Sequence, residues 1–120
     1  MSKRALVIGA YGQDGAYLCR HLLSLGYEVY GGIRRTSSGG PWRHERLGIK
    51  VPEVYCDVTD RESVEFAVKR WLPDEIYNLA AQAHVGASWD MPGHTLDVNG
   101  QGALNVFLAM GRAKLFQAST

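Results

Sequence analysis

The sequence contains little cysteine and no long apolar stretch, and both absences narrow the class of protein. Only Cys19 and Cys56 are present, and they form no Cys-x-x-Cys pair, which argues against a disulfide scaffold or a cysteine metal site. No apolar run approaches the roughly 18 residues of a membrane span. The first residues lead directly into a short apolar run instead of a signal peptide, so we expect a reduced, cytoplasmic protein with no membrane partner.

An excess of charge of one sign is also missing. Thirteen Lys and Arg residues against twelve Asp and Glu residues give a net charge of +1, which predicts no nucleic-acid partner. The four histidines show no ligand spacing, so no metal site is expected. The chain has 120 residues, of which 46% are hydrophobic and 21% charged, a composition typical of one globular domain with its own core.

Short apolar runs alternate with helical patterns along the chain. Helices are expected from the first glycine turn to Gly26, from a Thr59–Glu62 capping box to Pro73, and over residues 95–112. Strands are predicted at residues 5–8, 28–33, 50–56, 75–79 and 114–118, and the continuous apolar run of the first indicates burial on both faces. This alternation predicts an α/β fold with a doubly wound parallel sheet in the order 3-2-1-4-5, which is the NAD(P)-binding Rossmann fold.

Two of the expected helices carry an apolar face that should pack on the sheet. The face of the first comprises Tyr17, Leu18, Leu22 and Leu25. The face of the second comprises Val64, Ala67, Val68, Trp71 and Leu72. Residues 34–41 are predicted to be loop, and Trp42 with Arg43 and Arg46 to be a loop that covers the surface.

A glycine turn follows the first expected strand. Gly9, Gly12 and Gly15 stand in the pattern Gly-x-x-Gly-x-x-Gly before the first helix. Glycines at these points allow a tight turn, a close approach to a pyrophosphate and packing of the helix against the strand. The pattern in this context predicts a dinucleotide site, and a plain tight turn is the alternative.

An acidic residue is missing where an NAD site needs one, about 20 residues beyond the turn. Between Val29 and His44 the chain has no Asp or Glu, and its polar residues there include Arg34, Arg35, Thr36, Ser37 and Ser38. Guanidinium and hydroxyl groups bind a 2′-phosphate, so NADP is favoured over NAD. A solvated basic loop is the alternative.

Two further strand ends carry candidate cofactor contacts. Asp57 ends the third strand, where it could accept a hydrogen bond from the adenine amino group or serve as a loop carboxylate or helix cap. Residues 78–82 end the fourth strand with small side chains, which would let the inner ribose approach or would serve helix–strand packing alone.

These segments together resemble one family. GAYGQDG, RRTSS, YCDVTD, EIYNLAAQAHV, DVNG and the terminal FQAST are similar in order and spacing to segments of GDP-mannose 4,6-dehydratases, which are extended short-chain dehydrogenase/reductases. Gln13-Asp14 inside the turn, the double arginine and QAST are more specific than a generic Rossmann pattern. The resemblance covers nearly the whole chain.

The resemblance implies a set of site residues. NADP would contact the glycine turn, the double-arginine segment and the ends of the third and fourth strands, namely Gly9, Ala10, Tyr11, Gly12, Gln13, Asp14, Gly15, Arg34, Arg35, Thr36, Ser37, Asp57, Val58, Leu79, Ala80, Ala81, Gln82 and Ala83. His94 falls where the family usually has a tyrosine that contacts the cofactor. Ser88 would contact the substrate, and Thr120 would be the catalytic threonine that hydrogen-bonds the sugar hydroxyl being oxidised.

The implied reaction converts GDP-mannose to its 4-keto-6-deoxy product through an internal NADP-dependent redox cycle. The family's Tyr-x-x-x-Lys motif and the glutamate that follows its threonine do not occur in this sequence. Residues 1–120 are therefore expected to be the NADP-binding domain at the amino-terminal end of a longer lyase, without activity of their own. A nucleotide-sugar reductase or epimerase, or a non-catalytic NADP-binding module, is the alternative.

Assembly is the last expectation. The helix expected over residues 95–112 has apolar residues on more than one face, namely Val98, Leu104, Val106, Phe107, Leu108 and Met110. A helix of this kind is buried on both sides, which predicts a homodimer such as the family forms. The stretch between Arg35 and Asp57 is several residues shorter than in the family, which puts a tetramer in doubt.

Overall fold

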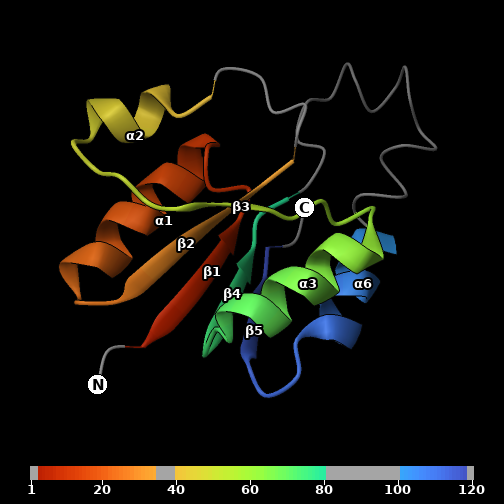
Figure 1. Cartoon of the computed structure of the whole chain (residues 1–120). Helices are drawn as coiled ribbons and strands as arrows, with labels where there is room; N and C mark the ends of the chain where they lie inside the picture. The colour runs from red at the N-terminus through yellow and green to blue at the C-terminus, as the bar shows by residue number, and fades with distance from the viewer. Residues whose placement is uncertain (1–2, 35–39, 81–100, 119–120) are drawn as a thin grey trace, which may run out of the picture.

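The computed structural model describes residues 3–34, 40–80 and 101–118. Figure 1 shows five parallel strands with helices on both sides. The elements in chain order are β1 (Arg4–Ile8), α1 (Gln13–Ser24), β2 (Glu28–Ile33), α2 (Trp42–Arg46), β3 (Glu53–Tyr55), α3 (Arg61–Trp71), β4 (Glu75–Asn78), α6 (Gly102–Ala109) and β5 (Lys114–Gln117). The strand order β3-β2-β1-β4-β5 confirms the predicted doubly wound sheet.

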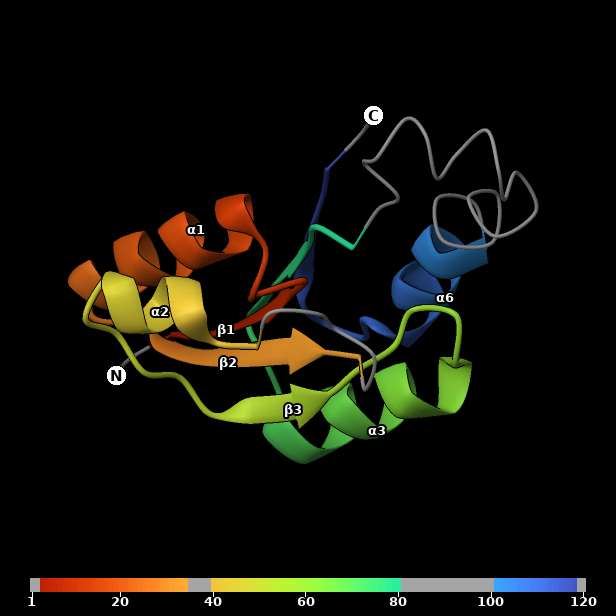
Figure 2. The same cartoon turned by 90° about the horizontal axis from the view of Figure 1, so that it is seen from above.

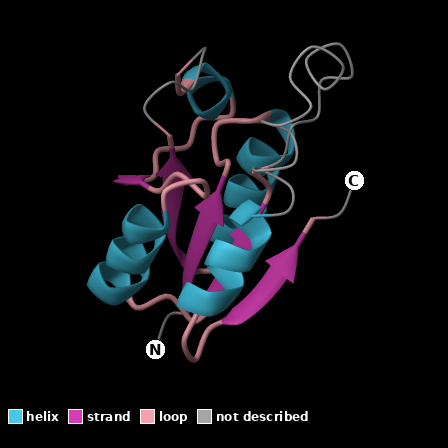
Figure 3. Cartoon of the chain, turned by 90° about the vertical axis from the view of Figure 1, so that its right-hand side faces the viewer, coloured by secondary structure: helices cyan, strands magenta, loops and turns pink. Residues whose placement is uncertain are grey.

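β1 lies in the middle of the sheet and is covered on both faces. Successive side chains of a strand point to opposite faces, so Ala5 and Val7 join the cluster with α1, whereas Leu6 and Ile8 join the cluster with α3 and α6. Figure 2 shows α1 and α2 on one side of the sheet and α3 on the other, and Figure 3 shows the same layers from the side. Double burial explains the continuous apolar run of this strand.

The register of the sheet brings three strand ends together. Ile8 is paired with Gly32 of β2 and with Asn78 of β4. Because all five strands are parallel, these ends lie on the carboxyl edge of the sheet, where doubly wound folds bind their ligands. The turn between β1 and α1 starts at this edge.

Several predicted boundaries are too long. The third strand pairs over Glu53–Tyr55 instead of residues 50–56. α6 ends at Ala109 instead of residue 112, because Gly111 adopts a positive φ of 59° and the chain turns toward β5. Residues 95–100 of that expected helix lie outside the described residues.

The predicted Thr59–Glu62 capping box is wrong. α3 begins after Asp60, and the Thr59 N–H and hydroxyl both donate to the Asp57 carboxylate, at 3.0 and 2.8 Å. The Ser63 hydroxyl donates to the Asp60 carbonyl at 2.8 Å. Thr59 is thus engaged by the carboxylate two residues before it, and the helix starts one residue later.

The apolar helix faces are also corrected by the structure. α1 packs on the sheet through Gly15, Ala16, Cys19 and Leu22, whereas Tyr17 and Leu25 are 50% and 60% exposed. At the end of α3, Leu72 is 65% exposed because its left-handed φ of 48° directs the chain away from the helix.

Two further features of the fold concern the loop region after β2 and the length of the helices. Residues 42–46, expected to be loop, form the short helix α2. None of the helices in the described ranges is long and apolar enough to cross a membrane.

Candidate functional site

The glycine turn is shaped by contacts that leave no room for a side chain at two positions. Gly9 has a φ of 85°, and its N–H donates to the Gly32 carbonyl at 2.9 Å. A Cβ on Gly15 would lie 2.8 Å from the Ala10 Cα atom, where it would clash with backbone. A Cβ on Gly12 would meet only the Gly9 carbonyl oxygen, at an ordinary 3.5 Å. The fold itself therefore requires glycine at 9 and 15 but not at 12.

The turn delivers the N-terminus of α1 to the carboxyl edge of the sheet. α1 begins at Gln13, and no side chain caps its N-terminus, because the N-cap residue is Gly12. The first N–H groups of a helix have no partner inside the helix and carry its positive dipole end. Gln13 and Asp14 are exposed beside these groups. This geometry suits a phosphate or pyrophosphate.

β4 closes the other side of the turn. Leu79 donates its N–H to the Ile8 carbonyl at 2.9 Å, and a Cβ on Gly9 would lie 3.2 Å from the Leu79 carbonyl carbon. Asn78, which is 1% exposed, accepts from the Ala80 N–H and donates to the Gln117 side chain. The predicted residues Leu79 and Ala80 therefore lie against the turn.

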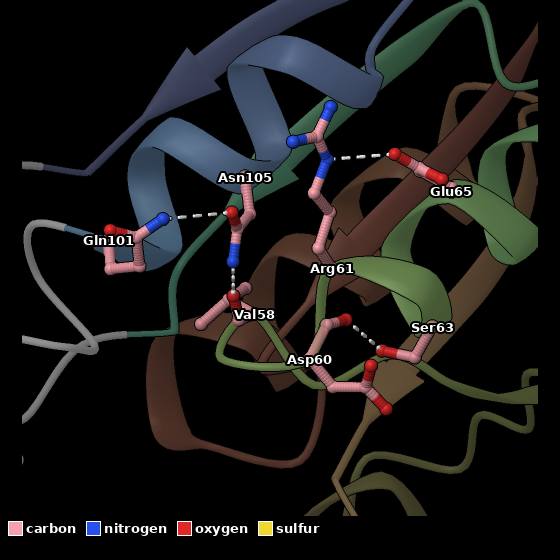
Figure 4. A network of polar contacts seen from close by, with 7 residues as sticks. All are labelled: Val58, Asp60, Arg61, Ser63, Glu65, Gln101 and Asn105. Carbon is pink, nitrogen blue, oxygen red and sulfur yellow. Dashed lines mark hydrogen bonds and ion pairs between the residues drawn. The ribbon is translucent and has the colours of Figure 1, made fainter.

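The end of β3 serves a structural role that the sequence left open. Asp57 is the loop carboxylate that receives Thr59, and Val58 is 3% exposed within the core. The Asn105 side chain of α6 donates to the Val58 carbonyl at 2.8 Å, and Gln101 donates to Asn105 (Figure 4). This network ties α6 to the strand end. A contact of Asp57 and Val58 with adenine stays a prediction.

Of the remaining predicted site residues, the structure describes one, Arg34. Arg34 follows β2 directly and is exposed at the same edge of the sheet. Outside the described residues lie Arg35, Thr36, Ser37, Ala81, Gln82, Ala83, Ser88, His94 and Thr120.

The sequence analysis missed a set of contacts that α2 makes with the turn. The buried His44 ring places Nε2 at 2.7 Å from the Ala10 carbonyl oxygen, and Arg43 donates to the Tyr11 carbonyl at 3.1 Å. The Tyr11 hydroxyl donates to the Glu53 carboxylate. Burial and this carboxylate raise the pKa of Tyr11, so its phenol stays protonated. No sequence motif links residues so far apart in the chain. Because residues 42–46 were expected to be loop, no contact between them and the turn was predicted.

A pocket of about 440 Å³ lies between α1 and α2. It is lined by Gln13, Ala16, Tyr17, Trp42, Arg43, Arg46 and Leu47. Two arginines and no acidic residue line it, whereas the adjacent turn carries the Asp14 carboxylate.

The described residues offer little other reactive chemistry. No three His, Cys, Asp or Glu side chains gather within the described ranges to hold a metal ion. Burial raises the pKa of the Cys19 and Cys56 thiols to about 12, so both remain protonated at neutral pH and act in packing. The chemistry of the described turn is thus that of backbone N–H groups at a helix N-terminus, which suit a phosphate.

Comparison with known proteins gives a consistent result. Residues 6–120 match the family model described as GDP-mannose 4,6 dehydratase. A GDP-mannose 4,6-dehydratase of Vibrio cholerae is 39% identical over 134 residues, which cover 100% of this chain and 36% of that protein. The human GDP-mannose 4,6 dehydratase is 40% identical over 131 residues, covering 97% of this chain and 35% of the relative. The chain thus spans about a third of the length of these curated relatives.

Solved structures share the fold over the same extent. A UDP-glucose 4-epimerase of Thermus thermophilus in complex with NAD matches with a TM-score of 0.79 and 32% identity, over 93% of this chain and 36% of that one. A UDP-glucose-4-epimerase of Stenotrophomonas maltophila with bound NAD matches with a TM-score of 0.85 and 26% identity, over 98% and 37%.

Proposed function

The chain belongs to the GDP-mannose 4,6-dehydratase family, and from this premise we propose that residues 1–120 form the dinucleotide-binding domain of a nucleotide-sugar 4,6-dehydratase acting on GDP-mannose. The observation that carries the proposal is the match over residues 6–120. The glycine turn supports it, because close contacts at Gly9 and Gly15 require glycine there and α1 begins directly after the turn, so its N-terminus is available to a phosphate.

We propose NADP as the cofactor. The end of β2 carries the exposed Arg34 and, next to it, Arg35, with no carboxylate as far as His44. An Asp or Glu there would bind the ribose hydroxyls of NAD and repel a 2′-phosphate, whereas a guanidinium binds phosphate oxygens in pairs. The solved relatives with NAD support a nicotinamide dinucleotide in general.

A bound nicotinamide dinucleotide would supply reversible hydride transfer for the proposed reaction, in which C4 of the hexose is oxidised, water is eliminated and C6 is reduced. The residues of this chain bind and orient. The turn holds the pyrophosphate, Arg34 to Ser37 hold the 2′-phosphate, and Thr120 hydrogen-bonds the C4 hydroxyl while Ser88 contacts the substrate. No tyrosine in the sequence is followed four positions later by lysine. We therefore propose that the acid–base groups of the reaction correspond to residues in the remaining two thirds of the relatives, which this chain does not span.

The proposal also covers the cellular location and the assembly of the protein. Both cysteines are free thiols, which fits a cytoplasmic enzyme. The outer faces of α6 and α3 carry apolar side chains that are about half exposed or more, namely Leu104, Phe107, Leu108 and Phe66. Exposed apolar side chains of this kind fit a homodimer formed through these helices.

A nucleotide-sugar epimerase is the second candidate, because the solved structures described above are UDP-glucose 4-epimerases. A chimera separates the two. The chain replaces the matching third of the Vibrio cholerae dehydratase, and conversion of GDP-mannose to the 4-keto-6-deoxy product is assayed. Product formation supports the proposal. A chimera that folds and binds NADP but forms no product contradicts it.

A further inference from the structure

Two side chains of α2 hold the backbone of the glycine turn from outside. His44 is 2% exposed, and its Nε2 atom lies 2.7 Å from the Ala10 carbonyl oxygen. A carbonyl oxygen can only accept, so Nε2 carries the hydrogen of this bond. One residue along, Arg43 donates to the Tyr11 carbonyl. Consecutive carbonyls of the turn are thus both fixed by α2.

This hold decides where the N–H groups of the turn point. The peptide bonds here are trans, and in a planar trans peptide the C=O and N–H point in opposite directions. With the Ala10 carbonyl directed at His44, the Tyr11 N–H points away from α2. The Gly12 N–H is used within the turn, because it donates to the Gly9 carbonyl at 3.1 Å. No described residue accepts a hydrogen bond from the Tyr11 N–H.

We propose that His44 is a positioning residue for the dinucleotide, which holds the Ala10 carbonyl so that the Tyr11 N–H is presented to the pyrophosphate. The inference rests on the dinucleotide site proposed above and adds to it a residue 34 positions away from the turn. His44 touches no reacting atom and acts through the backbone.

Further contacts make the hold rigid before any ligand arrives. The His44 ring packs edge-on against the Tyr11 ring, with centroids 5.0 Å apart. The Tyr11 hydroxyl is in turn held by Glu53, beside β2. A turn that is already fixed loses little conformational freedom on binding, which strengthens affinity.

The test compares two substitutions of His44 in the full chain. Glutamine places an amide nitrogen as many bonds from Cβ as Nε2 of histidine, so His44→Gln keeps a donor near the Ala10 carbonyl. His44→Met has a similar length and no donor. Calorimetry measures the affinity for NADP and for adenosine 2′-monophosphate, which has the adenine and 2′-phosphate but no pyrophosphate. Circular dichroism and thermal unfolding confirm that each variant is folded.

The expected result is selective. His44→Met weakens NADP binding about tenfold, the scale of one lost hydrogen bond, and leaves adenosine 2′-monophosphate within about twofold. His44→Gln stays within about threefold of wild type for both ligands. Unchanged NADP affinity in folded His44→Met, or an equal loss for both ligands, overturns the inference. A wild-type chain that binds neither ligand overturns the proposed function instead.

A second pair keeps the inference testable if His44→Met does not fold. Arg43→Met removes the bond to the Tyr11 carbonyl, and Arg70→Met removes the same charge from an exposed position of α3, on the other side of the sheet. We expect Arg43→Met alone to weaken NADP, by about threefold, and not adenosine 2′-monophosphate. Equal effects of the two substitutions on NADP contradict positioning through the backbone.

Discussion

The two faces of the sheet are built in different ways. On the α1 face the buried cluster includes Ala5, Ala10 and Cys19, and backbone segments approach one another closely around Gly9 and Gly15. On the α3–α6 face the largest buried side chains, Leu6, Ile8 and Ile76, pack against the helices. One face therefore depends on close backbone contacts and the other on side-chain volume, which suggests different consequences of mutation.

The two faces also differ in what they present to the outside. On the α1 face, α2 surrounds the turn with hydrogen bonds from His44 and Arg43. On the other face, α6 directs Leu104, Phe107 and Leu108 outward. The first arrangement suits a small charged ligand and the second a protein partner.

The largest effect is expected at Gly15, where a single methyl group should break the α1 face. Gly15→Ala places Cβ 2.8 and 2.9 Å from backbone atoms of Ala10, which cannot move without displacing the turn. We expect the free energy of unfolding to fall by about 3 kcal/mol, measured by urea denaturation.

Gly12→Ala is the matched control. Its Cβ meets nothing closer than 3.5 Å, so the free energy of unfolding should change by less than about 1 kcal/mol. If the turn binds a pyrophosphate, this variant should still lose about tenfold in NADP affinity, because the new methyl group stands where the ligand must approach. Similar destabilisation by the two substitutions would contradict the difference in fit.

On the α3–α6 face the matching change is Val106→Ala. Val106 is fully buried in the cluster with Val64 and Ile76, and its truncation leaves a cavity. The free energy of unfolding should fall by about 2 kcal/mol, while the NADP affinity of the folded variant stays at the wild-type value. A loss of NADP affinity measured by calorimetry would show that the two faces are coupled.

The fold could largely be predicted from the sequence because short strand patterns alternate with helical patterns, and the central strand β1 is apolar throughout its buried part. The apolar run Ala5–Ile8 followed by the glycine turn predicted that a buried strand is followed by a helix at the carboxyl edge of the sheet. Helix faces were less predictable. Tyr17 and Leu72 are apolar at helical spacing and yet exposed, since small residues on α1 and a left-handed residue after α3 decide what is buried.

The candidate site could be predicted only where neighbours in sequence form it. The Gly9–Gly15 turn is of this kind. His44 and Glu53 reach the turn through tertiary packing across more than thirty residues, and a short helix such as α2 has too few turns to show periodicity. The loop role of Asp57 likewise becomes visible only in the structure, where its carboxylate accepts from the Thr59 N–H and hydroxyl.

Cofactor choice sharpens the comparison from the ligand side. We expect NADP to bind at least tenfold more tightly than NAD, a difference of about 1.4 kcal/mol, because arginines stand where NAD sites carry a carboxylate. Arg35→Asp should weaken NADP and leave NAD little changed. Calorimetric titration with both nucleotides measures this, and equal affinities or a preference for NAD would contradict it.

The smallest effect on the chain itself is expected for Phe107→Glu. Phe107 is 59% exposed on α6, so a glutamate at this position removes little buried area, and the NADP affinity should stay within about twofold of wild type. Its effect should instead fall on association. An apolar patch on the outside of a helix is covered in a twofold dimer by the same patch of the partner, and a charge on both copies is then desolvated twice. We expect light scattering at micromolar concentration to find the wild type as a dimer and Phe107→Glu as a monomer. Lys114→Gln, a change of the same size in charge at an exposed position at the start of β5, is the control for charge alone and should leave the dimer intact. A wild-type monomer, or a Phe107→Glu variant that still dimerises, would mean that the outward residues of α6 serve another purpose than self-association.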